Sequence, residues 1–254
     1  MNGKSVLVEV GKCIGCRGCQ VACKQWHNLP AEKTENTGSY QNPPNMSSQT
    51  YTVVRFNEVE QGDELKWNFF KDQCRHCLEP MCKYEADDVV KDAIQIDKNG
   101  AVIFTDKTKN LGNINMEECC PCAVPHQNQE SGAWCKCDFC SDRLENGLEP
   151  ACVKACPTGA LTFGDRNEIL KLAKSRLADV QKSHPKACLL DEDEVRWIYL
   201  LQEKETDYQM SIRNREKRYF GLNKILSPKN PAWIAAGSLA MLFKWREDRV
   251  RGNR

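Results

Sequence analysis

The residues most able to carry chemistry are the sixteen cysteines, most of which occur in groups with regular spacing. Cys13 opens the run C-x2-C-x2-C-x3-C, which ends at Cys23. In such a run the first three thiolates bind irons of one four-iron cubane, whereas the fourth binds a neighbouring cluster. The run therefore predicts a pair of adjacent iron-sulfur clusters rather than a single metal site.

A second run completes this pair. It consists of C-x2-C beginning at Cys137 and of C-x3-C-P, which ends at Cys156 and Pro157. Under crossed ligation, the last cysteine of each run binds the cluster of the other run. The expected ligands are Cys13, Cys16, Cys19 and Cys156 for cluster A, and Cys23, Cys137, Cys140 and Cys152 for cluster B. Cys19 and Cys23 are about 6 Å apart along a helix axis, so one helix would serve both clusters.

The middle of the chain contains an incomplete copy of this pattern. Cys74, Cys77 and Cys82 begin a third run, and Cys120-Pro121 resembles the end of a fourth. The positions where four further cysteines would be expected hold Ala86, Asn110, Asn113 and Met116. All four losses fall on one cluster under the crossed rule. Cys74, Cys77, Cys82 and Cys120 would therefore complete a third cluster, C, so that the chain would hold three 4Fe-4S clusters and one lost site.

Four cysteines remain after these ligands are assigned: Cys119, Cys122, Cys135 and Cys188. We interpret them as buried or incidental thiols, with Cys119 as an alternative to its neighbour Cys120 in cluster C. Pro121 and the spacing to Cys137 favour Cys120. The histidines at positions 27, 76, 126 and 184 form no H-x3-H pair of the kind that binds zinc on a helix, and we expect them to be packed or solvated.

Two other uses of cysteine compete with iron-sulfur ligation. Zinc ribbons also contain C-x2-C pairs, but a tetrahedral zinc site has no need of the third and fourth cysteines of the first run. A zinc-stabilised interaction protein is the alternative from a different functional class. Disulfides are disfavoured because 16 cysteines in 254 residues fall below the content of small secreted scaffolds, and residues 1–10 carry no secretory signal of their own.

The remaining composition is that of a folded chain without a substrate site. The sequence has 36 Lys and Arg against 35 Asp and Glu, so no basic excess indicates binding to nucleic acid. Hydrophobic residues make up 41% of the chain, which is enough to bury a core. Neither G-x-G-x-x-G nor a P-loop is present, and no nucleophile is spaced beside a base. We therefore expect iron redox chemistry and no catalytic residue.

Two segments of these runs resemble a known protein family. Residues 13–26, CIGCRGCQVACKQW, and residues 149–160, EPACVKACPTGA, are similar to the ferredoxin-like iron-sulfur subunits that partner molybdenum or tungsten bis-pterin oxidoreductases. The resemblance covers about residues 5–165, and most members carry four clusters. The lost site and the segment QWHNLP at 25–30 resemble the three-cluster beta subunit of formate dehydrogenases from anaerobic sulfate-reducing bacteria.

The resemblance implies an electron-transfer subunit. A catalytic molybdenum or tungsten bis-pterin subunit would oxidise formate, and this chain would pass the electrons to an external acceptor such as a cytochrome or a membrane subunit. The same role beside an aldehyde, polysulfide or tetrathionate oxidoreductase is the alternative. The resemblance also implies a periplasmic location, reached by export with a partner that bears the signal, with or without membrane association; the cytoplasm is the alternative.

The resemblance and the hydrophobic pattern predict an α+β fold with two interleaved bacterial-ferredoxin-like modules and a C-terminal helical extension. Residues 1–50 plus 128–165 would hold clusters A and B, and residues 51–127 would form an inserted module with cluster C and the lost site. Strands are expected at 6–8, paired with 160–163, at 51–56, and as a hairpin at 93–97 and 101–105. Residues 31–50 are interpreted as a surface loop, with contact to the catalytic partner as the alternative.

Residues 166–254 would form the extension. Asp165 is expected to cap a helix over 166–181, whose apolar face would cover a cluster module. The charged segment 203–218 suggests a solvated helical face. Residues 230–243 are uncharged, but as a helix they would be about 20 Å long, against about 30 Å for a hydrocarbon core. This tail is either a helix docked on a partner or at the membrane interface, or a membrane anchor of the kind that the resemblance implies.

Overall fold

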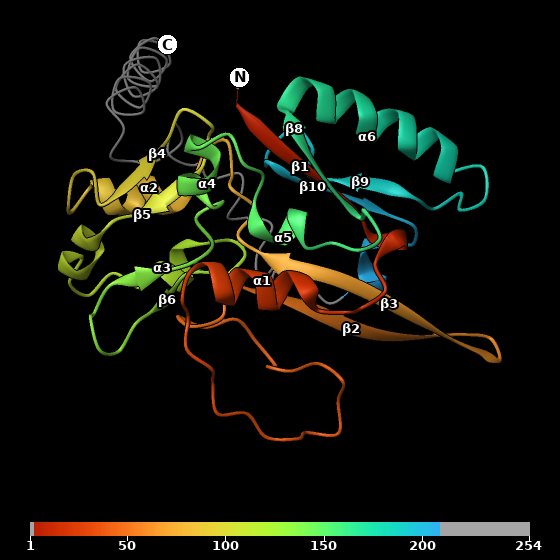
Figure 1. Ribbon diagram of the computed structural model, residues 1–254, viewed down its shortest axis with the longest axis horizontal. Helices are drawn as coiled ribbons and strands as arrows, with labels where there is room; N and C mark the ends of the chain where they lie inside the picture. The colour runs from red at the N-terminus through yellow and green to blue at the C-terminus, as the bar shows by residue number, and fades with distance from the viewer. Residues whose placement is uncertain (1–2, 209–254) are drawn as a thin grey trace, which may run out of the picture. The chain divides into compact units, whose positions relative to one another are not determined.

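The computed structural model describes residues 3–208, which combine helices with strands (Figure 1). Within that range no helix is long and apolar enough to cross a membrane. The predictions for the tail at 230–243, and for residues 209–218 of the charged segment, lie outside the described residues.

A four-stranded sheet brings together segments that are far apart in the sequence. In spatial order it consists of β8 (Leu161–Asp165), β1 (Lys4–Glu9), β10 (Trp197–Leu201) and β9 (Cys188–Leu190). β1 runs antiparallel to β8, with Val6 opposite Phe163, and parallel to β10, with Val6 opposite Trp197. The predicted pairing of the first strand with the strand near residue 160 is confirmed.

The two faces of this sheet have different neighbours. On one face α6 (Arg166–Val180) packs Ile169 and Ala173 against Leu7, Ile198 and Leu200. On the other face Val6, Val8, Trp197 and Tyr199 pack toward Phe70, Phe139 and Cys152. The predicted helix is confirmed, and it covers the face of this sheet opposite the cysteine motifs.

Asp165 does not cap this helix as predicted. It occupies the N-cap position, but its side chain makes no capping hydrogen bond. The carboxylate instead pairs with the Lys4 ammonium at 2.8 Å, because β1 and β8 place the two residues opposite each other. The ion pair joins the first strand to the start of α6.

The expectation of a purely helical extension from residue 166 is wrong for the described part of that segment. β9 and β10 follow α6 and join the sheet, and all five residues of β10 are buried. A continuous apolar run such as WIYLL is typical of a strand that is covered on both faces. Through its parallel pairing with β1, β10 belongs to the core of the sheet.

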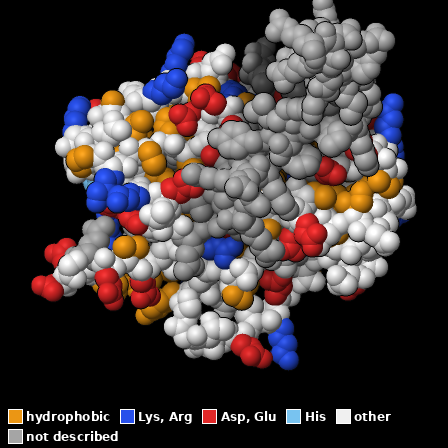
Figure 2. Space-filling view, turned by 180° about the vertical axis from the view of Figure 1, so that it is seen from behind, with side chains coloured by type: hydrophobic (Ala, Val, Ile, Leu, Met, Phe, Trp, Pro, Cys, Tyr) orange, Lys and Arg blue, Asp and Glu red, His pale blue; other side chains and the backbone are white. Residues whose placement is uncertain are grey.

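A long hairpin lies below the sheet in the view of Figure 1. It is formed by β2 (Thr52–Gln61) and β3 (Glu64–Gln73), which pair along their whole length. β2 extends the predicted strand, whereas β3 was not predicted. The hairpin tip is exposed and carries Glu58, Glu60, Asp63 and Glu64, and acidic side chains mark this end of the molecule at the left of Figure 2.

The middle of the chain forms short elements around a second apolar core. They are α2 (Met81–Asp87), β4 (Ile94–Ile96), β5 (Val102–Phe104), α3 (Met116–Cys119), β6 (His126–Gln127) and β7 (Trp134–Cys135), with a 3-10 turn at Asp106–Asn110. The predicted hairpin is confirmed, since β4 and β5 pair around Gly100, whose φ of 86° suits a glycine. The remaining short helices are α1 (Gly18–Trp26), α4 (Ser141–Glu145) and α5 (Ala151–Lys154), with 3-10 turns at Val10–Lys12 and Glu205–Asp207.

The segment predicted as a surface loop contains no helix or strand between residues 29 and 46. Its residues 33–40 are exposed. The loop is held at its end by polar contacts, in which Arg55 donates to the Pro44 carbonyl at 2.9 Å and Gln20 to the Asn42 carbonyl at 3.4 Å. This supports the surface-loop interpretation, and contact with a catalytic partner stays a prediction.

Candidate metal centres

One cavity is lined by all four sulfurs expected for cluster A. Cys13, Cys16, Cys19 and Cys156 contribute to its wall together with Lys71. The first three come from the loop after β1 and from the start of α1, and the fourth follows α5. Because α1 and α5 pack against each other, residues 137 positions apart in the sequence reach the same cavity.

The loop of the first run owes its shape to residues in the left-handed region. Gly15 has φ 66°, and a Cβ there would lie 2.9 Å from the Phe69 ring. The backbone N–H of Gly15 also hydrogen-bonds to the Cys13 sulfur. A larger residue at position 15 would therefore disturb both the turn and the wall of the cavity.

The four cysteines expected for cluster B form a buried group. Cys23, Cys137, Cys140 and Cys152 are each at most 8% exposed. Cys23 interacts electrostatically with Cys137, Cys140 and Cys152, so the four sulfurs share one region. Cys23 comes from α1 and Cys152 from α5, the two helices that also serve the cavity of cluster A.

A histidine contacts this group, which the sequence did not reveal. His27 Nε2 lies 3.7 Å from Cys140 Sγ and 3.4 Å from Asp138 Oδ1. These three side chains have the types that hold a single metal ion, and their ligand atoms lie within 4.8 Å of one another. Because Cys140 also belongs to the group of four sulfurs, we interpret His27 as a hydrogen-bonding neighbour of a cluster ligand.

A further cavity is lined by the sulfurs expected for cluster C. Its wall contains the four expected cysteines and one more sulfur: Cys74, Cys77, Cys82, Cys120 and Cys122. Cys119 does not line this cavity and packs instead against the second apolar core. This arrangement favours Cys120 over Cys119 as a ligand of cluster C. Cys122, which we interpreted as a buried or incidental thiol, also lies on the wall of this cavity.

The four positions of the lost site carry no metal ligand in a shared cavity. Ala86 and Met116 are fully buried in the second apolar core, beside Leu111. Asn110 and Asn113 are exposed. The space where the pattern would place a fourth cluster is thus filled by apolar packing.

The donor sets suit iron-sulfur clusters chemically. None of the sixteen cysteines, all of which lie among the described residues, forms a disulfide. Burial raises the pKa of Cys19, Cys23 and Cys82 to about 12, so these thiols are protonated at neutral pH until a metal displaces the proton. Backbone N–H groups of Lys83 and Ala151 donate hydrogen bonds to the sulfurs of Cys82 and Cys140. Hydrogen bonds of this kind help to set the reduction potential of a cluster. The residues present therefore fit the expected groups.

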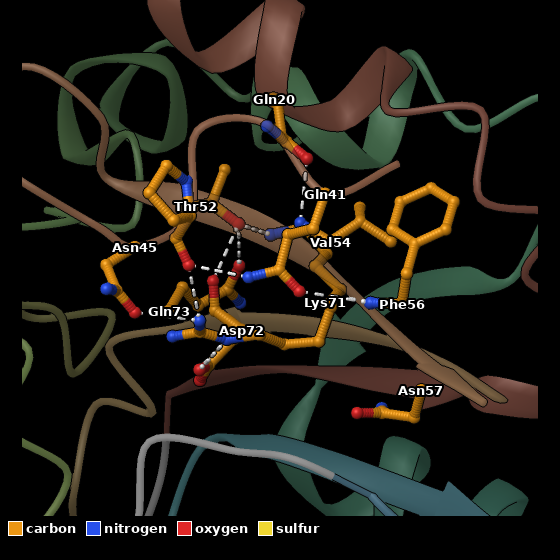
Figure 3. Close-up of polar contacts among 12 residues, drawn as sticks. Gln20, Gln41, Asn45, Thr52, Val54, Phe56, Asn57, Lys71, Asp72 and Gln73 are labelled. Carbon is orange, nitrogen blue, oxygen red and sulfur yellow. Dashed lines mark hydrogen bonds and ion pairs between the residues drawn. The ribbon is translucent and has the colours of Figure 1, made fainter. Parts of the chain in front are cut away.

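Two buried lysines accompany these sulfurs. Lys71 on β3 lines the cavity of cluster A, and its Nζ donates to Thr52 Oγ1 at 2.9 Å within the polar network of Figure 3. Lys136 lines the cavity of cluster C and donates to the Cys137 carbonyl at 2.9 Å. The sequence suggests that Lys136 lies near a cluster, because it directly precedes Cys137. Lys71 is far in sequence from the runs of clusters A and B, so the sequence did not indicate that it lies beside them.

Comparison with known proteins was consistent with these centres. Residues 65–166 match the 4Fe-4S dicluster domain family. The chain is 49% identical over 199 residues to a formate dehydrogenase subunit beta of Megalodesulfovibrio gigas, covering 78% of this chain and 93% of that protein. It is 45% identical over 210 residues to formate dehydrogenase 2 subunit beta (cytochrome c-553) of Nitratidesulfovibrio vulgaris, covering 81% and 96%.

A more distant relative extends the match. The iron-sulfur subunit of formate dehydrogenase-O from Escherichia coli is 36% identical over 226 residues, which cover 89% of this chain and 71% of that protein. All three relatives are named as beta or iron-sulfur subunits of formate dehydrogenases. The chain belongs to the family of iron-sulfur beta subunits of formate dehydrogenases.

Proposed function

We propose that this chain relays electrons from a catalytic molybdenum or tungsten formate dehydrogenase subunit to an external acceptor, and that it holds three 4Fe-4S clusters for this purpose. The observation that carries the proposal is the grouping of the expected sulfurs: one cavity contains all four of set A and another all four of set C. Each cluster, when bound, exchanges one electron at a time. The chain itself supplies ligands, burial and fixed charge.

Three clusters account for the structure better than four. At the lost site, Ala86 and Met116, which replace two of the expected ligands, are fully buried in an apolar core. Twelve of the sixteen cysteines suffice for three cubanes. The remaining four lie outside the three sets, although Cys122 adjoins set C.

The contacts among the sulfurs favour the order A, B, C along the relay. Cys19 of set A interacts electrostatically with Cys152 of set B. Cys137 of set B interacts with Cys74 of set C. These two interactions support an order in which set B lies between sets A and C.

The acceptor and the location form a further part of the proposal. A cytochrome is supported by the printed name of the Nitratidesulfovibrio vulgaris relative, which mentions cytochrome c-553. A membrane subunit contacted through residues 230–243 is the second candidate. We place the complex in the periplasm, reached by co-export with the catalytic subunit, with the cytoplasm as the alternative.

The relay is tested on the complex of the full chain with its catalytic subunit under anaerobic conditions. Formate should bleach the absorption at about 400 nm and produce signals of reduced four-iron clusters in electron paramagnetic resonance (EPR). An absence of bleaching by formate, with clusters that dithionite still reduces, would contradict a formate-linked relay and favour another bis-pterin partner. Cell fractionation of the native host tests the proposed compartment separately.

A further inference from the structure

Lys71 is a lysine buried among the cysteines of two candidate centres. It is 3% exposed, although lysine is almost never fully buried unless it is paired. Its Nζ lies 4.7 Å from the centroid of the Trp197 ring and donates to Thr52, which fixes the position of the charge (Figure 3). Its electrostatic neighbours include Cys19 of set A and Cys152 of set B.

Lys71 lacks the carboxylate partner that the buried side chains of Arg55 and Arg75 have. Arg55 pairs with Asp72 at 3.0 Å and Arg75 with Asp191 at 2.9 Å. Within residues 3–208, no carboxylate lies at ion-pair distance from Lys71. Burying a cation without an anionic partner is costly. A negative charge beside this lysine would offset that cost.

Bound clusters would supply that charge. Lys71 lines the cavity of set A, and Cys152 of set B and Cys19 of set A lead its electrostatic neighbours. Four thiolates give a four-iron cluster a net negative charge, which grows when the cluster is reduced. A fixed cation beside two such clusters stabilises the reduced state of both.

Lys136 has the same features on the other side of set B. It is 5% exposed, and its Nζ lies 4.8 Å from the centroid of the Phe104 ring. Its main electrostatic neighbours are Cys74 and Cys82 of set C and Cys137 of set B. Among the described residues it too makes no ion pair with a carboxylate.

We propose that Lys71 is a buried cation shared by clusters A and B, that Lys136 is its counterpart between clusters B and C, and that each raises the reduction potentials of both clusters beside it. The inference rests on the proposed function, since it needs the three clusters in place. A cation shared by two neighbours shifts both potentials in the same direction. The difference in reduction potential between the two neighbouring clusters is then left unchanged by the shared cation, which suits a relay.

The test is an EPR-monitored redox titration of the anaerobically purified full chain. Lys71→Met and Lys71→Gln remove the charge with two different shapes, and Lys71→Arg retains it. Lys174→Met is the matched control, because it removes the same charge from an exposed position on α6, on the sheet face away from the cysteines. Lys136→Met tests the counterpart.

At an effective dielectric constant of about 20, a unit charge about 12 Å from another changes an equilibrium constant roughly tenfold. In the neutral Lys71 variants we expect the reduction constants of clusters A and B to fall about tenfold, a shift of about 59 mV to lower potential, with a smaller change at cluster C. Lys136→Met should instead lower clusters B and C. Lys71→Arg should keep the potentials of clusters A and B near those of the unmodified chain.

The inference would be overturned if clusters A and B had the same reduction potentials in the neutral Lys71 variants as in Lys174→Met. An equal shift of all three clusters in the neutral Lys71 variants would also overturn it. If the neutral Lys71 variants fail to retain iron while Lys71→Arg and Lys174→Met retain it, the charge itself is needed beside the clusters, which supports the inference. Loss of iron from Lys71→Arg as well would show a packing role and overturn it. A wild-type chain without iron would refute the proposed function instead, so the two failures are distinguishable.

Discussion

Crossed ligation can be tested by removing cysteines in pairs. The structure places Cys19 and Cys156 on one cavity, although Cys19 shares α1 with Cys23 and Cys156 follows the helix that carries Cys152. Two double variants separate this arrangement from an uncrossed one. They are Cys19→Ala with Cys156→Ala, and Cys19→Ala with Cys23→Ala.

The expected magnitudes follow from four irons per cubane. Under crossed ligation the first pair belongs to cluster A alone, so the variant should keep about eight of about twelve irons. The second pair belongs to clusters A and B, so that variant should keep about four. An uncrossed arrangement, with each run binding its own cluster, reverses these two values.

The assay is iron and acid-labile sulfide per chain after anaerobic purification, together with an EPR count of reduced clusters. Cys135→Ala with Cys188→Ala provides the control, because neither sulfur lines a cysteine cavity and the variant should keep about twelve irons. About four irons in the Cys19 and Cys156 double variant, with about eight in the Cys19 and Cys23 variant, would refute the crossed reasoning.

Three further outcomes are expected. Cys120→Ser should lose about four irons, whereas Cys119→Ser should lose none, because only Cys120 lines the cavity of cluster C; iron analysis distinguishes them. Met116→Ala should lower the temperature at which the clusters bleach while leaving the iron content unchanged, since emptying a fully buried site costs about 2–5 kcal/mol. Iron uptake by the metal-free chain should weaken from about pH 8 to about pH 6, because thiols such as Cys23, whose pKa burial raises to about 12, must release protons that compete more strongly as the pH falls. Uptake that is independent of pH would contradict the last of these.

The candidate centres could be predicted from the sequence to a large extent because ligand spacing is a local property. The run from Cys13 to Cys23 and the run ending at Cys156 each fix several sulfurs on one short loop or helix. The crossed rule then requires only that two helices meet, and α1 and α5 do so. The hairpin around Gly100 was predictable for the same reason, since its turn and strands are contiguous.

Several features that depend on distant contacts were not predictable, although the pairing of β1 with β8 was. β10 pairs with β1 across about 190 residues, and its apolar run follows a helix, so no local signal distinguished it from more helix. Asp165 is an ordinary capping residue by sequence, but the β1–β8 register brings Lys4 to it. Lys71 lies on a strand whose partner and neighbours come from four separate segments, so its burial beside the sulfurs became visible only in three dimensions.

The most direct measurement is the metal and sulfide content of the full chain, purified without oxygen, alongside its visible spectrum. Three cubanes predict about twelve irons and about twelve sulfides per chain, with absorption at about 400 nm. About sixteen irons would show that the lost site is filled, and about eight that set C stays empty. A colourless, iron-free chain that contains zinc would contradict the electron-relay account altogether.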